Sequence, residues 1–171
     1  SNNYYHWIRS KTDHGTSHVI EALIRKLNDP SCYYNAEIYT IAPTDNHCFF
    51  CQANRDDSGD WYFKRDGYIN GDWDQIPWQQ TNRYVQNRFK MKIERNGANV
   101  TAYFDQGRGW ETAGSTFTSF PDVASRAGFG LYVPSTSLDN TCWVDYLFVR
   151  KYSTASVSYS FSQVHERYRV W

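Results

Sequence analysis

Apolar and polar positions alternate strictly through residues 88–95, where Phe89, Met91 and Ile93 are separated by charged side chains. A period of two is typical of a β-strand with one buried face. The pair Asn96-Gly97 follows and suits the positive φ angles of a two-residue turn, after which residues 98–104 run back. This turn places the apolar residues of both strands on one face, in the pairs Ile93 with Val100, Met91 with Ala102 and Phe89 with Phe104.

Further short strands are predicted along the rest of the chain. A second hairpin joins residues 34–42 to residues 47–54 through the turn Pro43-Thr44-Asp45-Asn46. The pattern of residues 19–27 fits either a strand or the one candidate helix. Residues 142–149 are apolar on both faces apart from Asp145, which predicts a central position in a sheet. The remaining predicted strands are residues 61–64, 109–113 and 127–133.

About eleven short strands separated by turn residues, with little or no helix, predict an all-β fold in which two antiparallel sheets form a β-sandwich. A length of 171 residues is about one domain. Eighteen basic residues balance eighteen acidic ones, and such a neutral chain lacks the positive charge that nucleic-acid binding needs. No apolar run is long enough to span a membrane.

The chain has four cysteines. An even number favours two disulfides formed in an oxidising compartment, and free buried thiols are the alternative. Three pairings are open. The Cys48-Phe49-Phe50-Cys51 segment has the spacing of a redox or zinc motif, but no second pair of ligands accompanies it. The disulfide candidates are Cys32, Cys48, Cys51 and Cys142.

Residues 66–82 are predicted to form a long loop rich in aromatic and polar side chains. Aromatic faces can stack on a pyranose ring while carboxylates and amides bond its hydroxyls, so this loop is a candidate carbohydrate platform. In the alternative interpretation, its tryptophans cap the open edge of the core. Trp61 and Trp143, on predicted strands, are expected in the core. The candidate binding residues are Tyr68, Asp72, Trp73, Asp74 and Trp78.

The order of these pieces resembles the concanavalin A-like lectin/glucanase superfamily, in particular the laminin-G-like jelly-roll modules of surface proteins. The resemblance covers residues 17–152 and is carried by the segments HVIEALIRK, NHCFFCQANRDDSGDWYFKRDG, NRFKMKIERNGANVTAYFDQGRGWETAGS, RAGFGLYVPS and WVDYLFVRKY. It implies a jelly roll located outside the cell or at its surface. Residues 1–16 are then an N-terminal extension, and residues 153–171 form an extra strand and tail.

The same fold hosts lectins, hydrolases, lyases and structural modules. The laminarinase-like branch of the superfamily carries its catalytic carboxylates as E-x-D-x-x-E on one strand, and the five glutamates of this chain do not form that motif. Glu21 and Glu37 lie on predicted strands and are a candidate pair to face one another, although a carboxylate on a strand more often lies at an edge or points outward. We therefore expect a non-catalytic protein, with little support for a polysaccharide lyase or glycoside hydrolase.

Asp145 interrupts an apolar strand, and a buried carboxylate must be paired or ligated. A salt bridge and a structural calcium ion, which jelly-roll modules often carry, are the two alternatives. No other cofactor is expected. Asn99-Val100-Thr101 is an N-glycosylation acceptor whose Asn99 and Thr101 point away from the core in the predicted hairpin.

A further alternating segment begins after the predicted sandwich, where four apolar residues are separated by serines: Ala155, Val157, Tyr159 and Phe161. A strand at this place needs a sheet to join, either its own or the open edge of a neighbouring subunit. The leading hypothesis is a secreted or cell-surface module that binds carbohydrate. The alternative is a structural subunit of an extracellular filament or surface layer, which assembles with like subunits by donor-strand exchange.

Overall fold

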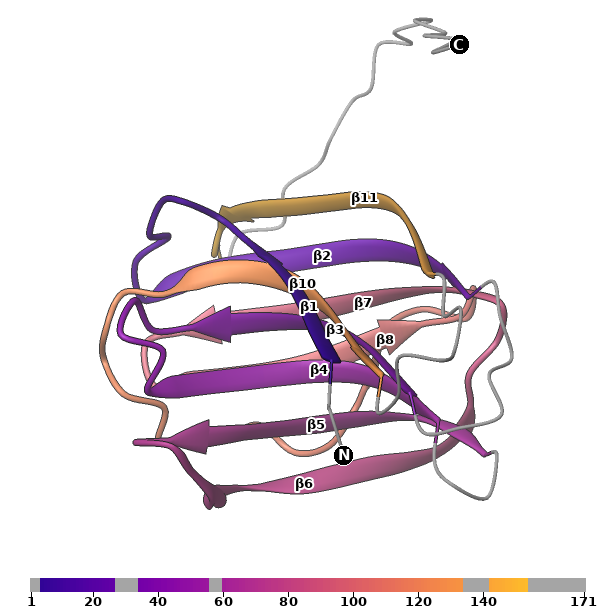
Figure 1. Ribbon diagram of the computed structural model, residues 1–171, viewed down its shortest axis with the longest axis horizontal. Helices are drawn as coiled ribbons and strands as arrows, with labels where there is room; N and C mark the ends of the chain where they lie inside the picture. The colour runs from indigo at the N-terminus through magenta and orange to yellow at the C-terminus, as the bar shows by residue number, and fades with distance from the viewer. Residues whose placement is uncertain (1–3, 27–33, 56–59, 134–141, 154–171) are drawn as a thin grey trace, which may run out of the picture.

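The computed structural model describes residues 4–26, 34–55, 60–133 and 142–153, and these form eleven strands and no helix (Figure 1). Two antiparallel sheets pack face to face, which confirms the predicted all-β sandwich. None of the described residues belongs to a helix that could cross a membrane.

The first sheet has six strands in the order β1-β10-β3-β4-β5-β6. The second sheet has five strands in the order β11-β2-β7-β8-β9. The strands of the first sheet are β1 (Tyr4–Arg9), β10 (Arg126–Val133), β3 (Tyr34–Ile41), β4 (His47–Arg55), β5 (Trp61–Ile69) and β6 (Asp72–Tyr84). Those of the second are β11 (Cys142–Lys151), β2 (Ser17–Lys26), β7 (Arg88–Asn96), β8 (Asn99–Asp105) and β9 (Glu111–Thr112).

The main core lies between the two sheets and is built mainly from alternate residues of the inner strands. Phe63 on β5 stacks on Phe104 of β8, with ring centroids 4.2 Å apart, and contacts Phe89 of β7 edge-on. Trp61 is buried here, as predicted. For residues 19–27 the sequence leaves helix and strand open, and the described part of this segment, residues 19–26, is a strand because Ile20, Ala22 and Ile24 point into this core with a period of two.

The β7–β8 hairpin forms as predicted, but its register differs by two residues. The turn residues are Gly97 and Ala98, with φ of 61° at Gly97, and Ile93 therefore pairs with Ala102 and not with Val100. A shift of two residues leaves every side chain on its predicted face. The β3–β4 hairpin agrees with the sequence, and Asp45 in its turn has a φ of 58°.

The segment predicted as a long loop is instead most of a third hairpin, β5–β6. Asn70 and Gly71 have φ of 54° and 79°, the pair of positive angles that a type I′ turn requires. Three register shifts interrupt the pairing of β5 with β6. These bulges break the alternation of apolar residues, which explains why the sequence pattern did not indicate a strand.

The two ends of the described chain also differ from the sequence prediction. Tyr4–Arg9, within the stretch assigned to an N-terminal extension, forms β1 and pairs with β10. The prediction that residues 142–149 are central is wrong, because β11 is the edge strand of its sheet. Trp143, expected in the core, is more than half exposed on this strand.

Cys48 and Cys51 are buried free thiols, so the disulfides predicted for them are wrong. They lie three residues apart on β4 and therefore project from opposite faces of the sheet. Cys51 belongs to the core between the sheets, and Cys48 belongs to a second apolar cluster on the outer face. Cys32 and the side chain of Cys142 lie outside the described part of the structure.

Candidate carbohydrate site

The outer face of the six-stranded sheet, which points away from the five-stranded sheet, carries a second cluster of buried residues. On β4 the outward positions are Cys48, Phe50, Gln52 and Asn54, and all four are buried. If this face of the sheet were in contact with water, these alternate positions would carry exposed polar residues. The middle of this outer face is therefore shielded from water by neighbouring side chains.

Aromatic side chains pack over one half of the outer face. Trp73 on β6 stacks on Phe50, with ring centroids 5.8 Å apart and planes 6° from parallel, and lies 4.8 Å from the Tyr68 ring. Trp7 on β1 packs against Tyr39 and Phe50 from the other side, at 5.3 and 6.2 Å. The cluster thus joins rings from five strands.

A polar row crosses the same face beside these rings. The backbone register aligns Glu37, Gln52 and Lys64 on neighbouring strands. The Gln52 amide donates a hydrogen bond to Glu37 Oε2 at 2.7 Å, and Lys64 forms a salt bridge of 3.0 Å with Asp66. Lys64 Nζ also lies 6.0 Å from the centre of the Trp78 ring. The row runs from β3 toward Trp78 on β6.

Trp7 closes the other end of this row. Gly130 on β10 lies between the Trp7 indole and Glu37, and a Cβ added there would sit 2.7 Å from Trp7 Cδ1 and 2.9 Å from Glu37 Oε1. Only glycine leaves the indole and the carboxyl group this close to the sheet. The side chain of Trp7 is thereby held against the polar row.

Burial raises the pKa of Glu37 to about 7, against the opposing influence of hydrogen bonds from Gln52 and Trp7 and of the Lys64 charge. The carboxyl group is almost completely buried. Asp66 nearby acts in the same direction as burial. Near neutral pH, Glu37 can therefore either donate or accept a hydrogen bond.

The structure brings together only part of the predicted carbohydrate platform. Trp73 and Trp78 are exposed on the outer face, whereas Tyr68 is buried beneath Trp73. Asp72 lies at the β5–β6 turn and accepts hydrogen bonds from the Asp74 backbone and from the Gln75 side chain, which lowers its pKa. Asp74 is exposed beside it.

Sequence reasoning missed the residues of the outer face that come from other strands. Trp7 lies on a strand that was not predicted, and Glu37 was considered only as a catalytic group. The sequence of β4 contains a signal for this face, because Cys48, Phe50 and Gln52 share one face of a strand whose other face carries Phe49, Cys51 and Ala53 of the core.

The pair of glutamates considered for catalysis is separated by the whole sandwich. Glu37 lies on the outer face of the six-stranded sheet. Glu21 lies on the outer face of the five-stranded sheet, where Tyr146 donates a hydrogen bond to it at 2.7 Å. These two carboxyl groups cannot act on one glycosidic bond.

Asp145 adopts the salt-bridge alternative. It is the extra residue of a β-bulge between Val144 and Tyr146, which turns its carboxylate toward Arg25. Arg25 Nε and Nη2 each lie 2.9 Å from one carboxylate oxygen, and Arg88 Nη2 lies 3.7 Å from Oδ2. Two guanidinium groups do not fit a calcium site. Among the described residues, no three His, Cys, Asp or Glu side chains gather around a common point.

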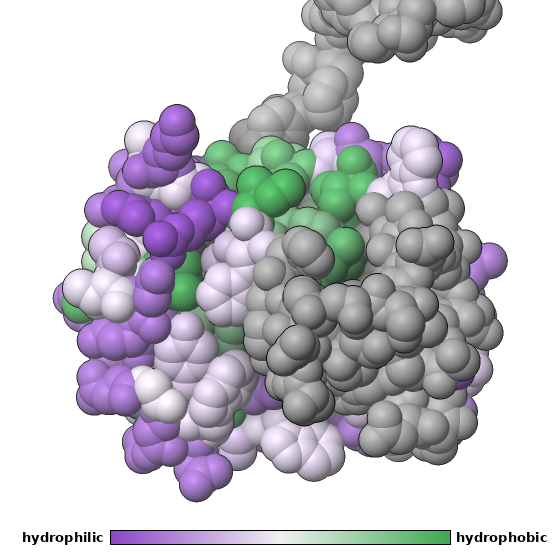
Figure 2. Space-filling model, in the orientation of Figure 1, coloured by the Kyte–Doolittle hydropathy of each residue, from purple (hydrophilic) through white to green (hydrophobic). Residues whose placement is uncertain are grey.

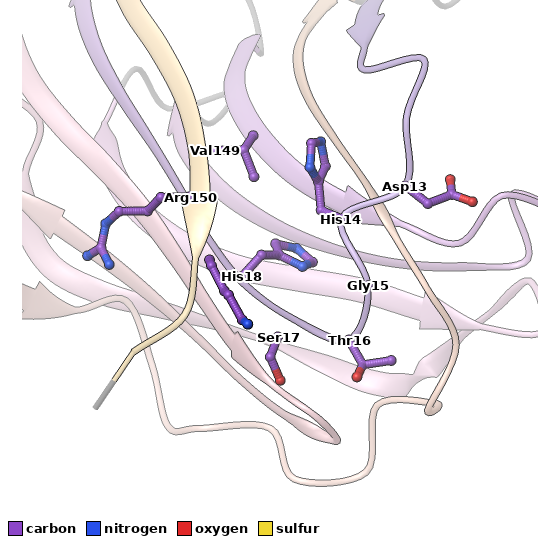
Figure 3. Close-up of a pocket in the computed structure, with 9 residues that line it drawn as sticks. Asp13, His14, Gly15, Thr16, Ser17, His18, Val149 and Arg150 are labelled. Atoms are coloured by element: carbon purple, nitrogen blue, oxygen red, sulfur yellow. The ribbon is translucent and has the colours of Figure 1, made fainter. Parts of the chain in front are cut away.

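A cavity of about 470 Å³ opens at one end of the sandwich, between residues 13–18 and the end of β11 (Figure 3). The rings of His14 and His18 lie beside each other there, with centroids 6.0 Å apart. His18 Nε2 lies 3.1 Å from Thr40 Oγ1 and so connects β2 to β3 of the other sheet. This contact gives His18 a structural role.

Asn99 is exposed at the start of β8, as its predicted role as a glycan acceptor requires. Thr101 faces away from the main core but is buried, with its hydroxyl 2.8 Å from that of Thr116. The predicted assembly strand, Ala155 to Phe161, lies outside the described residues.

No family model and no curated protein matches the chain. Solved structures do match. A carbohydrate-binding module, CBM66 from Bacillus subtilis, is similar with a TM-score of 0.56 and 17% identity, over 86% of this chain and 82% of the module. A toad ovary galectin, solved with thio-digalactose, has a TM-score of 0.54 and 11% identity, over 88% and 99%.

A β-1,3-glucanase from Mycobacterium marinum is also similar, with a TM-score of 0.56 and 15% identity, over 84% of this chain and 67% of the enzyme. The neighbours therefore include both binding proteins and a hydrolase, and at these identities the likeness extends to the fold alone. The chain shares the two-sheet jelly-roll fold of these lectins, carbohydrate-binding modules and glucanases.

Proposed function

We propose that the protein binds carbohydrate on the outer face of the six-stranded sheet. One observation carries the proposal: three tryptophans surround a polar row on this face and keep much of their surface in water. Trp7, Trp73 and Trp78 are 39%, 50% and 61% exposed. Scattered exposed apolar residues are ordinary, but three indoles on one face are a feature of binding surfaces.

Trp73 supplies the stacking surface in this proposal. One face of its ring stacks on Phe50, so the opposite face can receive the apolar side of a pyranose without reorganisation. Trp78 is placed next to Lys64 at the end of the polar row. Two indoles separated by polar groups suit an extended oligosaccharide better than a single sugar.

Lys64 and Asp66 are the hydroxyl partners in this arrangement. Their side chains are 13% and 15% exposed, and each already satisfies the charge of the other. Sugar hydroxyls can donate to the carboxylate and accept from the ammonium group without leaving an isolated buried charge. Similar folds in a carbohydrate-binding module and a galectin support this class of ligand.

The proposed binding role is non-catalytic, and we place it at the cell surface or outside the cell, where polysaccharides are displayed. The separation of Glu21 from Glu37 supports the absence of glycosidase chemistry. The exposed acceptor Asn99 is consistent with an extracellular location.

The test begins with the full chain on a broad glycan array, followed by titration calorimetry with the best oligosaccharide. Trp73→Ala and Trp78→Ala should each weaken binding by roughly fivefold, because one stacking contact is worth about 1 kcal/mol. Trp110→Ala is the matched control: this indole is also exposed, but it lies against Lys92 of the five-stranded sheet. Absence of binding on the array, or an equal loss in the control, would contradict the proposal.

A further inference from the structure

The sandwich is open on the side where its two edge strands, β1 and β11, lie. Ile8 pairs with the core residue Phe129, and Leu147 pairs with Ala22, so both side chains point between the sheets. Nevertheless Ile8 is 71% exposed, and Leu147 and Val144 are each 37% exposed. Figure 2 shows a hydrophobic patch at the height where Figure 1 draws β11 and β2.

The free edge of β11 runs along this open side. β11 has ten residues and pairs with β2, and no other described strand is hydrogen-bonded to it. An edge of this length with apolar side chains is a template for another strand. Phe148 on the outer side of β11 is also more than a third exposed. Val149 packs against the main core, whereas Val144, Leu147 and Phe148 of the same strand each keep more than a third of their surface exposed.

The sequence after β11 contains an alternating segment that suits a strand covering this open side of the sandwich. Eighteen residues follow the last described one, and residues 155–162 alternate apolar residues with serine. In a strand these residues present Ala155, Val157, Tyr159 and Phe161 on one face and four hydroxyls on the other. A strand of this kind can cover an apolar surface on one side and contact water on the other.

We propose that residues 155–162 of one copy of the chain pair with the free edge of β11 in a second copy. Their apolar face covers Val144, Leu147 and Ile8 of the acceptor, and their serines face solvent. Main-chain hydrogen bonds supply affinity, and the buried side chains fix the register.

The connection after β11 favours a second copy over the chain's own tail. The Tyr152 amide still bonds the Ser17 carbonyl at 3.4 Å, so the chain continues in line with β11 to that point. Only Ser153 and Thr154 then precede the alternating segment. A two-residue reversal needs positive φ, and the two hairpins of this chain with such turns supply it with Asn70-Gly71 and with Gly97. Ser153 and Thr154 are poor residues for such a turn.

A contact of the tail of one copy with β11 of the next is head-to-tail, and we expect a linear polymer because successive head-to-tail contacts that do not close into a ring continue without limit. The acceptor side lies apart from the outer face of the six-stranded sheet that carries Trp73 and Trp78. Assembly is thus independent of the proposed carbohydrate binding, and each can fail without the other.

The test uses two variants of the full chain, each able to play only one role. Val157→Asp with Tyr159→Asp removes the donor face, and Leu147→Asp removes the acceptor. Sedimentation velocity and electron microscopy should show polymers of the parent chain, monomers of either variant alone, and heterodimers when the two are mixed in equal amounts. Ser158→Asp, on the serine face of the same segment, should polymerise like the parent.

Circular dichroism confirms that each variant is folded, and Val144→Asn replaces Leu147→Asp where the latter is not. A parent chain that stays monomeric up to millimolar concentration would overturn the proposal. The same holds for polymers that persist in both variants, and for a mixture that forms no heterodimer.

Discussion

Gln52 donates a hydrogen bond of 2.7 Å to the Glu37 carboxyl group across the β3–β4 pair, and both side chains are almost completely buried. The Gln52 carbonyl oxygen makes no hydrogen bond with the described residues. This pair occupies the centre of the polar row. The protonation state of Glu37 therefore determines which hydrogen bonds the row can donate or accept.

Glu37→Gln should change how stability depends on pH. Because burial raises the pKa of Glu37 in the folded protein to about 7, above its unfolded value of 4.5, the folded state binds a proton more tightly. The resulting stability is complete below pH 4.5 and is lost as pH rises through 7. Urea denaturation should therefore show the variant to be more stable than the parent at pH 8, by roughly 2 kcal/mol, and no more stable at pH 4.

Asp74→Asn removes an exposed carboxyl group from the same sheet and serves as the control. Its stability should follow that of the parent at every pH. Parallel profiles for Glu37→Gln and the parent would show that Glu37 is ionised in the folded protein without cost.

The sandwich could be predicted from sequence because its core strands alternate regularly. β7 and β8 keep strict alternation, and even a turn displaced by one residue left Phe89, Met91 and Ile93 on the buried face. β6 was missed because its bulges interrupt the period, although Asn70-Gly71 is the same turn signal as Asn96-Gly97. Regular alternation of apolar and polar residues identifies a strand, whereas a bulge interrupts the alternation and hides the strand from such an analysis.

The position of a strand in its sheet was harder to predict. β11 is apolar on both faces, which indicates burial on both sides, yet it lies at an edge. An apolar pattern on both faces of a strand predicts that both faces are covered, but it does not indicate whether the same chain or another molecule covers them. The candidate site has the same limit, because Trp7 and Glu37 are 30 positions apart and meet only through the pairing of β1, β10 and β3.

His18 should produce the opposite pH dependence to Glu37. Burial, assisted by the charges of Arg95 and His14, lowers its pKa from 6.5 to about 4. The folded state therefore resists protonation, and stability that is complete above pH 6.5 is lost as pH falls toward 4. In a Glu37→Gln background, His18→Gln should reduce this acid loss by roughly 2 kcal/mol in urea titrations.

Thr40→Val provides the comparison for His18, because it removes the hydroxyl 3.1 Å from Nε2 without removing the imidazole. We expect it to lower stability by about 1 kcal/mol at every pH. If His18→Gln leaves the loss of stability at acid pH as steep as it is with His18 present, the titration of another group causes that loss.

Calcium removal should leave stability unchanged. Arg25 and Arg88 occupy the Asp145 carboxylate, so this site offers a cation no free oxygen pair. Thermal unfolding in excess EDTA and in millimolar calcium should give the same midpoint within about 1 °C. This difference is smaller than the shift that a change of about 1 kcal/mol in the free energy of unfolding produces. Asp145→Asn should lower the free energy of unfolding by about 1 kcal/mol or less, since the ion pair is partly exposed. A midpoint that rises with calcium and no longer does so in Asp145→Asn would restore the metal alternative.

Cys48 and Cys51 should be unreactive in the native protein and reactive in the unfolded one. Burial raises the pKa of Cys51 to about 12 and that of Cys48 well above its usual value, so neither forms the thiolate that attacks an alkylating reagent. Iodoacetamide at pH 8 should label both at least roughly a hundredfold faster in 6 M guanidinium than in buffer, because native labelling requires opening of β4. Peptide mass spectrometry without reductant distinguishes this result from a disulfide, in which neither cysteine would be labelled even after unfolding.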